Sequence, residues 1–387
     1  MRRFSSVAQK VAKPTVLPKN PNFGSGPCSK RPGWNLQVLA DAPLGRSHRS
    51  KIGKAKLKES IELTKKVLNV PAGFRVGIMA GSDTGAFEAA LWSMIGEREV
   101  DIFHWESFGA GWQSDVEKQL KPTKQVRVHG APYGELPDMA KYNGTSDAIF
   151  TWNGTTSGVR VPNADWIRAD RKGLTFCDAT SAAFVMDLPW DKLDITTFSW
   201  QKALGGEGAH GMIVLSDRAV QRLETYKPTW PVPKLFRMVK NMKVMEDIFE
   251  GSTINTPSML CVEDYIDALK WAEAQGGVAG LTALSNRNLQ VVKDFVKTSS
   301  WAKFLAKKDD IMSSTSICLT VDGLDGKGIK KMVALLEKEK VAYDIGAYRD
   351  APDGLRIWGG ATVTEADLKA LMPWLDWAYA QVKAESA

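Results

Sequence analysis

Short hydrophobic runs recur through the first part of the chain, and each is followed by a polar or glycine-rich segment. Runs of this kind are typical of strands that are buried on both faces of a parallel sheet. Helical or loop-like segments separate several of them, which favours an α/β fold with a mostly parallel sheet covered on both sides. The strands predicted by this pattern are 74–80, 100–105, 125–129, 148–152, 174–177, 195–200 and 212–215.

Two helices are predicted in the same region. Leu57, Ile61 and Leu68 recur at helical spacing among basic residues, which predicts an amphipathic helix over 54–68 with a solvated basic face. A second helix is expected over 86–94, directly after a turn rich in glycine and hydroxyl residues.

The pattern changes from about residue 274 onward, where shorter strands and longer helices indicate a small α+β domain. Thr364 precedes the last predicted helix, and Asp367 follows three residues later, an arrangement close to a capping box. The predicted strands are 315–321, 341–345 and 355–358, and the predicted helices are 327–338 and 365–382.

These patterns predict three parts: a basic N-terminal arm (1–20), a large domain (21–273) and a small C-terminal domain (274–387). The basic, aromatic stretch 228–243 contains several prolines, and we interpret it as a long surface segment at a subunit contact.

Composition narrows the function classes. The chain has 387 residues, of which 44% are hydrophobic and 25% charged, as is ordinary for a globular protein of two domains. No apolar run approaches the length needed to span a bilayer, which argues against a membrane protein. The net charge of +7 is spread along the chain, so we expect no nucleic-acid partner, and the modest excess suits small anionic substrates.

The arm carries Arg2, Arg3, Lys10, Lys13 and Lys19 but no acidic residue. Its basic, serine-bearing start is compatible with a mitochondrial transit peptide and equally with a disordered bacterial arm, and we leave it out of the fold.

The four cysteines lack disulfide or metal-type spacing, and Cys177 and Cys318 lie in apolar runs that favour buried, reduced thiols. We therefore expect a reducing compartment, the cytoplasm, or the mitochondrial matrix if the arm is a transit peptide, and no metal site.

Two strand ends carry the most informative residues. Asp178 ends one hydrophobic run, and Lys202 follows the next, just before a glycine-rich stretch. Sites in open α/β sheets gather at the carboxyl ends of strands. Such a pair suits pyridoxal phosphate: the lysine would hold the aldehyde as a Schiff base, and the aspartate would keep the pyridine nitrogen protonated. A capping aspartate and a solvated lysine are the alternative interpretation.

Other segments supply the remaining contacts that such a cofactor needs. The turn Gly81-Ser82-Asp83-Thr84-Gly85-Ala86 offers backbone donors and a helix N-terminus to a phosphate. The segment 153–158 offers threonines for the ring hydroxyl. An aromatic ring commonly stacks on the pyridine, and the candidates are Trp105, Phe108 and Trp112.

Substrate anions require arginine, whose fork matches carboxylate and phosphate. The candidates are the pair His48-Arg49 and the two arginines Arg349 and Arg356.

The motifs, taken in order, resemble the phosphoserine aminotransferases, members of the class V branch of fold-type I pyridoxal phosphate enzymes. The resemblance covers almost the whole chain after the arm. The matching motifs are Asn22-Phe23-Gly24-Ser25-Gly26-Pro27, Ser47-His48-Arg49, the Gly81–Gly85 turn, Asn153-Gly154-Thr155, Cys177-Asp178, Ser199-Trp200-Gln201-Lys202 and Ile254-Asn255-Thr256-Pro257.

The resemblance implies a seven-stranded sheet sandwiched by helices in the large domain, and it implies site roles. Lys202 would bond to the cofactor and Asp178 would pair with its ring nitrogen. Gln201, Asp83 and Thr84 would approach the phosphate, and Thr155 the ring oxygen. Asn255 and Thr256 would reach the cofactor of a neighbouring subunit, so the resemblance implies a homodimer with shared sites. His48, Arg49, Arg349 and Arg356 would contact the substrate anions.

Three departures from the family pattern stand out. The stacking position, often tryptophan, falls on Phe108. The C-terminal His-Arg pair of the family is Tyr348-Arg349 here. The phosphate turn carries an unusual acid, Asp83. These changes leave the lysine chemistry untouched but bear on how the substrate phosphate is held.

The activity implied by the resemblance is reversible transfer of an amino group between L-glutamate and 3-phosphohydroxypyruvate, giving O-phospho-L-serine and 2-oxoglutarate in L-serine biosynthesis. The alternatives are another class V aminotransferase of the alanine/serine–glyoxylate type and a non-catalytic relative that binds the cofactor. A cysteine desulfurase is disfavoured because Gln201 stands where a histidine is usual, and the late Cys318 lies in a strand-like run.

Overall fold

The computed structural model describes residues 11–385, and its largest element is a seven-stranded sheet in the order β1-β9-β8-β7-β4-β2-β3. β9 runs antiparallel to β1 and β8, and the pairs β8–β7, β7–β4, β4–β2 and β2–β3 are parallel. The predicted α/β class with a mostly parallel sheet is confirmed. The strands are β1 (Arg75–Ala80), β2 (Val100–His104), β3 (Val126–Gly130), β4 (Asp147–Thr151), β7 (Thr175–Asp178), β8 (Ile195–Ser199) and β9 (His210–Leu215).

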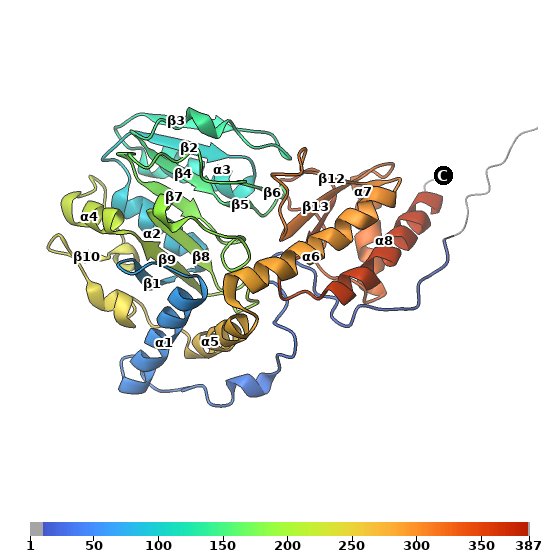
Figure 1. Cartoon of the computed structure of the whole chain (residues 1–387), viewed down its shortest axis with the longest axis horizontal. Helices are drawn as coiled ribbons and strands as arrows, with labels where there is room; N and C mark the ends of the chain where they lie inside the picture. Colours follow the sequence, from blue (N-terminus) through green and yellow to red (C-terminus); the bar gives the residue numbers. More distant parts are fainter. Residues whose placement is uncertain (1–10, 386–387) are drawn as a thin grey trace, which may run out of the picture.

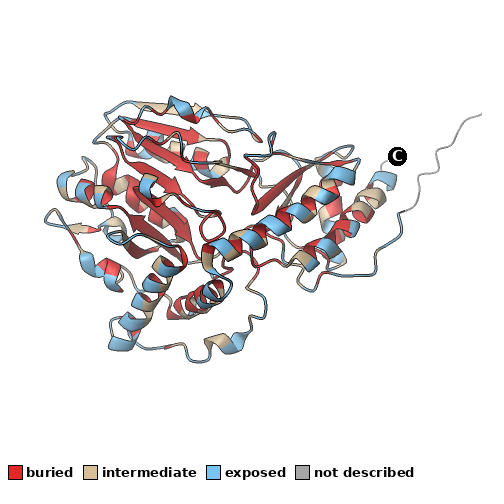
Figure 2. Ribbon diagram, in the orientation of Figure 1, coloured by how far each residue is buried: buried red, intermediate tan, exposed pale blue. Residues whose placement is uncertain are grey.

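Most strands of this sheet are buried on both faces and are drawn largely in red in Figure 2, whereas the edge strand β3 is only partly buried. Neighbouring residues on one strand, such as Ile149 and Phe150, belong to different hydrophobic clusters because successive side chains point to opposite faces. α2 covers one face with Phe87 and its neighbours, and α1 and α5 cover the other. The continuous hydrophobic runs in the sequence follow from this two-sided burial.

Helices and short strands connect and surround the strands of the central sheet (Figure 1). The stretch after α4, predicted as a surface segment, forms a small hairpin of β10 and β11. The helices and short strands of this part are α1 (Lys51–Val67), α2 (Ser82–Met94), α3 (Ser107–Ser114), α4 (Asp217–Thr225), α5 (Met259–Ala274), β5 (Asn153–Gly154), β6 (Val159–Arg160), β10 (Val239–Lys240) and β11 (Lys243–Val244).

A second, antiparallel sheet of three strands forms the C-terminal part, with long helices packed beside it (Figure 1). Thr364 begins the last helix as predicted: its hydroxyl accepts the Asp367 N–H at 3.1 Å and donates to the Asp367 carboxylate at 2.6 Å. The elements are α6 (Gly277–Thr298), β12 (Ala302–Phe304), β13 (Ser316–Val321), α7 (Gly326–Lys338), β14 (Leu355–Trp358) and α8 (Glu365–Glu385).

The predicted strand 341–345 is wrong. Tyr343 and Gly346 each form only an isolated bridge, to Asn22 and Leu355 respectively. Asp344 adopts φ +57°, in the left-handed region, which interrupts an extended backbone. The hydrophobic residues of this stretch are nevertheless buried, and for that reason its sequence looks like that of a strand.

The second half of the N-terminal arm packs against the C-terminal part, although the sequence analysis left residues 1–20 out of the fold. The indole of Trp374 donates to the carbonyl of Val16 at 2.8 Å, and the N–H of Lys19 donates to Asp367 at 2.6 Å. Farther on, the N–H of Trp358 donates to the carbonyl of Phe23 at 2.8 Å. Residues 1–10, on which the transit-peptide interpretation rests, lie outside the described residues.

The cysteines are free, and Cys177 and Cys318 are buried as predicted. Within residues 11–385, no helix combines the length and the apolar character that crossing a bilayer requires.

Candidate active site

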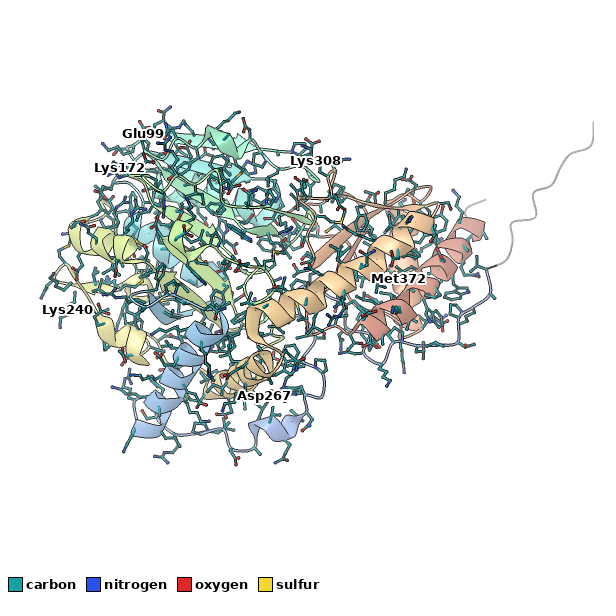
Figure 3. All side chains as sticks on the ribbon, in the orientation of Figure 1. Glu99, Lys172, Lys240, Asp267, Lys308 and Met372 are labelled. Atoms are coloured by element: carbon teal, nitrogen blue, oxygen red, sulfur yellow. The ribbon has the colours of Figure 1, made fainter. Side chains whose placement is uncertain are left out.

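A cavity of about 430 Å³ opens at the carboxyl ends of the central strands. Thr151, Asp178 and Ser199, the last residues of β4, β7 and β8, line it together. Glu99 and Lys172, labelled in Figure 3, precede β2 and β7 and mark the opposite edge of the sheet. The cavity therefore occupies the edge where α/β sheets carry their ligand sites. The predicted site residues that line it are Asp83, Thr84, Phe108, Thr155, Asp178, Gln201 and Lys202.

Lys202 is the buried amine of this cavity. It follows β8 in a turn, is 8% exposed, and donates from Nζ to the carbonyl of Ser25. Burial lowers the pKa of Lys202 below its ordinary value. Gly26 faces this amine so closely that a Cβ at position 26 would collide with Nζ. The glycine in the Ser25-Gly26-Pro27 motif thus makes room for the lysine.

Asp178 is held from two sides at the end of β7. Trp112 donates from Nε1 to Oδ2 at 3.0 Å, and the backbone N–H of Thr180 donates to Oδ1, also at 3.0 Å. Asp178 is 7% exposed, so these two donors replace much of the water that an ionised carboxylate requires. The geometry orients the carboxylate before any ligand binds.

The predicted phosphate turn has the conformation that a strand-to-helix turn of this type requires. Gly81 and Ser82 both adopt positive φ, +83° and +53°, and α2 begins at Ser82. A Cβ at Gly85 would collide with the carbonyl of Ala80, so the second glycine of the turn is needed for close packing. The first N–H groups of α2 and the positive end of its dipole therefore face the cavity, where they suit an anion.

The side chain of Asp83 has a neighbourhood that its assignment to the phosphate did not foresee. Its carboxyl group, only 6% exposed, lies beside the Asp178 carboxylate and the hydroxyls of Thr180 and Thr197. Burial and then the negative charge of Asp178 raise the pKa of Asp83 well above its ordinary value. Asp83 and Thr84 both line the cavity at this turn, and the backbone N–H groups and the Thr84 hydroxyl suit an anion better than a second acid does.

Several buried polar atoms of the cavity wall lack a hydrogen-bond partner among residues 11–385, which is unusual for polar groups removed from water. They belong to side chains at the strand ends and at the start of α2, all of which line the cavity. A polar ligand seated there would satisfy them. These atoms are Asp83 Oδ1, Thr151 Oγ1, Asn153 Oδ1, Thr180 Oγ1, Ser199 Oγ and Gln201 Oε1.

An aromatic pair borders the cavity. Phe108, in the first turn of α3, packs against Tyr348 with ring centroids 5.4 Å apart, and both line the cavity. The guanidinium groups of Arg349 and Arg356 each lie 5.5 Å from the centroid of the Tyr348 ring. Arg356 Nε is buried without a partner in the described chain, whereas the Arg349 side chain is 80% exposed. The two arginines therefore stand behind Tyr348 rather than in the cavity wall.

The other predicted contacts do not line this cavity: His48, Arg49, Asn255 and Thr256 lie away from it. His48 is buried with Nε2 unpartnered among the described residues, and burial lowers the pKa of its ring. Thr256 is exposed, and the amide of Asn255 donates to its carbonyl at 3.1 Å. None of these four residues contributes to the cavity wall of its own chain.

Glu106 is a site residue that the sequence analysis missed. One of its carboxylate oxygens accepts the Gly109 N–H at 2.8 Å, and the other accepts the Thr156 hydroxyl at 2.8 Å. Glu106 thereby fixes the start of α3 to the loop that carries Thr155, and it also lines the cavity. It directly follows the predicted strand 100–105, so the strand-end reasoning applied to Asp178 would have found it.

Known proteins resemble the chain in sequence and in fold. A phosphoserine aminotransferase of Methanosarcina barkeri is 58% identical over 371 residues, which cover 96% of this chain and all of the relative. The structure of a phosphoserine aminotransferase from Trichomonas vaginalis with bound pyridoxal phosphate superposes with a TM-score of 0.79 at 18% identity, over 92% of this chain and 100% of the other.

An alanine–glyoxylate aminotransferase of Nostoc superposes nearly as well, with a TM-score of 0.77 at 19% identity over 95% and 97% of the two chains. At such identities the structural similarities show the fold alone, whereas the Methanosarcina relative shows the family. No protein-family model matches the chain.

Proposed function

The chain belongs to the phosphoserine aminotransferase family, and from that premise we propose that it transfers an amino group between L-glutamate and 3-phosphohydroxypyruvate, with pyridoxal 5′-phosphate as cofactor. The products are O-phospho-L-serine and 2-oxoglutarate, and the reaction is reversible. The observation that carries the proposal is that Lys202 and Asp178 are buried in one cavity, at the ends of the adjacent strands β8 and β7.

The cavity fits this cofactor by its chemistry. Its buried polar atoms without partners match a ligand that has a phosphate, a phenolic oxygen and a ring nitrogen. Thr84, Gln201 and the N–H groups at the start of α2 would hold the phosphate. Thr155 would bond to the ring oxygen, and Phe108 would cover one face of the ring.

Lys202 and Asp178 perform the chemistry in this proposal. When bound, pyridoxal phosphate supplies an aldehyde that bonds to amines and a ring that withdraws electrons from the adjoining carbon. Burial lowers the pKa of Lys202 and so favours the neutral amine. In this proposal Nζ takes the proton from the Cα atom of the amino-acid substrate. Asp178, fixed by Trp112, would hold a proton on the ring nitrogen.

Basic groups near the cavity mouth would bind the two acidic groups of the substrate. Arg356 is the best-placed candidate of this chain because its Nε is buried and unpartnered beside Tyr348. Arg349 is a second candidate. In this proposal Tyr348 replaces the histidine of the family as the aromatic support between the two arginines.

We propose that the working form is a homodimer with shared sites. Asn255 and Thr256 stand outside the cavity of their own chain, and Thr256 is exposed. That placement is compatible with residues that reach the cofactor phosphate of a neighbouring subunit. His48 and Arg49 are likewise outside the cavity, and Arg49 would add its positive charge to the neighbour's substrate site, with His48 beside it.

Domain division and compartment are also proposals. The seven-stranded and three-stranded sheets support a large domain to residue 273 and a small domain from 274. We keep 1–20 as an N-terminal arm, of which Val16 and Lys19 bond to α8 of the small domain. Free cysteines, two of them buried in strands, support a reducing compartment, which we propose is the cytoplasm, with the mitochondrial matrix as the alternative.

The experiment that tests this function is a half-reaction screen. Amino acids are added singly to the protein loaded with pyridoxal phosphate, and the absorbance of the bound cofactor is followed. Phosphoserine and glutamate are expected to bleach it, and alanine and unphosphorylated serine are not. A preference for alanine or serine would favour a glyoxylate-type aminotransferase, and no bleaching by any amino acid would favour a non-catalytic relative.

A further inference from the structure

Two carboxyl groups lie side by side in the wall of the cavity, and the proposed reaction uses only one of them. Asp83 belongs to the first turn of α2, and Asp178 ends β7. They are 6% and 7% exposed, so little water separates or screens them. Two ionised carboxylates in such a place repel each other, and a buried carboxyl pair therefore favours the state in which one member keeps its proton.

The hydrogen bonds of Asp178 leave room for this proton. An ionised carboxylate has roughly four lone-pair positions. Trp112 and the N–H of Thr180 take two of them, one on each oxygen. Under the proposed function the ring nitrogen takes a third. The fourth is open to the neighbouring Asp83, whose Oδ1 has no partner among the described residues.

We propose that Asp83 is a positioning residue, which carries a proton and donates it as a hydrogen bond to Asp178, so that the Asp178 carboxylate stays aimed at the ring nitrogen of the cofactor. The inference deepens the proposed function and rests on it.

The charges around the pair determine how the proton responds to pH. The other titratable groups near the pair are Cys177 beside Asp178, His210 on β9 beside Ser82, and the lining residues Lys202, Glu106 and Tyr348. Burial and the charge of Asp178 raise the pKa of Asp83, and the nearby hydroxyls of Thr180 and Thr197 oppose the shift. Because the folded pKa is raised, the proton is present at lower pH and is lost as the pH rises through that value.

The test compares Asp83→Asn with Asp83→Ala in the protein loaded with pyridoxal phosphate. An asparagine amide donates to Asp178 at every pH, and alanine donates at none. The dissociation constant of pyridoxal phosphate and the absorbance of the bound cofactor are measured from about pH 6 to about pH 10, where ordinary carboxyl groups are fully ionised. Glu88→Gln, on α2 but outside the cavity wall, is the matched control.

We expect Asp83→Ala to raise the dissociation constant roughly tenfold, the effect of one hydrogen bond to a charged group, and Asp83→Asn to recover most of that loss. In alkaline solution the dissociation constant of pyridoxal phosphate should rise for the wild type and for Glu88→Gln. It should not rise for Asp83→Asn. An Asp83→Asn protein as weak as Asp83→Ala, or one that keeps the alkaline transition, would overturn the inference.

The measurements distinguish a failure of the role of Asp83 from a failure of the proposed function. Suppose that phosphoserine bleaches the cofactor of the wild type, but that Asp83→Asn and Asp83→Ala have the same dissociation constant for pyridoxal phosphate. Only the role of Asp83 is then overturned. If the wild type binds no pyridoxal phosphate, the proposed function fails and the role of Asp83 fails with it.

Discussion

Trp112 donates from its indole Nε1 to Oδ2 of Asp178 across 3.0 Å. The bond joins α3 to the end of β7, and the Trp112 ring also packs against Phe87 of α2, with centroids 4.5 Å apart. Trp112 therefore fixes Asp178 relative to two helices that form the cavity wall. Its place in the sequence suggested a stacking residue, but the structure gives it this hydrogen bond to the acid.

Replacement of Trp112 by phenylalanine keeps an aromatic ring and removes the donor. The buried Asp178 carboxylate then lacks one partner, and we expect the free energy of unfolding to fall by about 1.5–3 kcal/mol. Affinity for pyridoxal phosphate should fall as well, because the acid is no longer held in place. Denaturant unfolding and cofactor titration measure the two effects.

The matched control is Trp374→Phe, which removes an indole donor to the carbonyl of Val16, far from the cavity. It should lower stability and leave cofactor affinity unchanged. Equal loss of cofactor affinity in both variants would contradict a specific role for Trp112.

His210 makes the fold sensitive to acid. Its ring stacks on Trp200 at 4.6 Å, and its Nε2 accepts the N–H of Ser258 at 3.2 Å, so the ring must be neutral on that nitrogen. Burial lowers the pKa of His210 to about 4. Between the ordinary value and the lowered one, the unfolded chain binds more protons than the folded chain, so stability is intact above about pH 6.5 and falls as the pH drops toward 4.

We expect His210 to remove about 3 kcal/mol of unfolding free energy across this interval. His210→Gln should flatten that part of the profile, which chemical unfolding at a series of pH values measures. A variant with the same acid slope as the wild type would show that another group is responsible.

The arm contributes to stability through Asp367. This buried carboxylate accepts the N–H of Lys19 at 2.6 Å and of Asn20 at 3.3 Å, in addition to the hydroxyl of the capping residue Thr364 at 2.6 Å. Asp367→Ala leaves these donors without a partner and should lower the midpoint of thermal unfolding, at a cost of about 2 kcal/mol. The exposed Asp350→Ala, which loses only its contact with Arg349, is expected to change the midpoint little.

Shared sites can be tested by complementation. Lys202→Ala removes the amine of a chain's own site, and a double Asn255→Ala, Thr256→Ala variant damages the neighbour's site. When the two inactive proteins are unfolded together and refolded, half of the dimers are mixed, and each mixed dimer holds one intact site. Activity should return to about a quarter of the wild-type value. If activity does not return, the sites are contained within single chains.

Much of the fold followed from the sequence because its physical causes are local. Two-sided burial gave most strands of the central sheet a hydrophobic run, with the partly exposed edge strand β3 as an exception, and the Thr364 cap marked the start of α8 to the residue. The reversed direction of β9 was not predicted, because its hydrophobic run is the same in either direction. At 341–345, the buried hydrophobic residues gave the sequence the pattern of a strand. No strand forms there, because the backbone of Asp344 has a positive φ.

The site was predictable to the extent that it follows strand ends. Asp178 and Lys202 were found because each closes or follows a hydrophobic run, and the structure brings both to one cavity. The neighbourhood of Asp83 was not foreseen, because it depends on how α2 packs over β7 and β8. Tyr348 was missed as a lining residue for the same reason: it comes from a distant loop that meets Phe108 only in the folded chain.

The central claim is that one buried amine, that of Lys202, bonds to the cofactor. The most direct measurement is to load the protein with pyridoxal phosphate, reduce it with borohydride, digest it and locate the modified peptide by mass spectrometry. The account predicts a single phosphopyridoxyl group on Lys202, and none anywhere in Lys202→Ala. Modification of a different lysine, or none in the wild type, would contradict it.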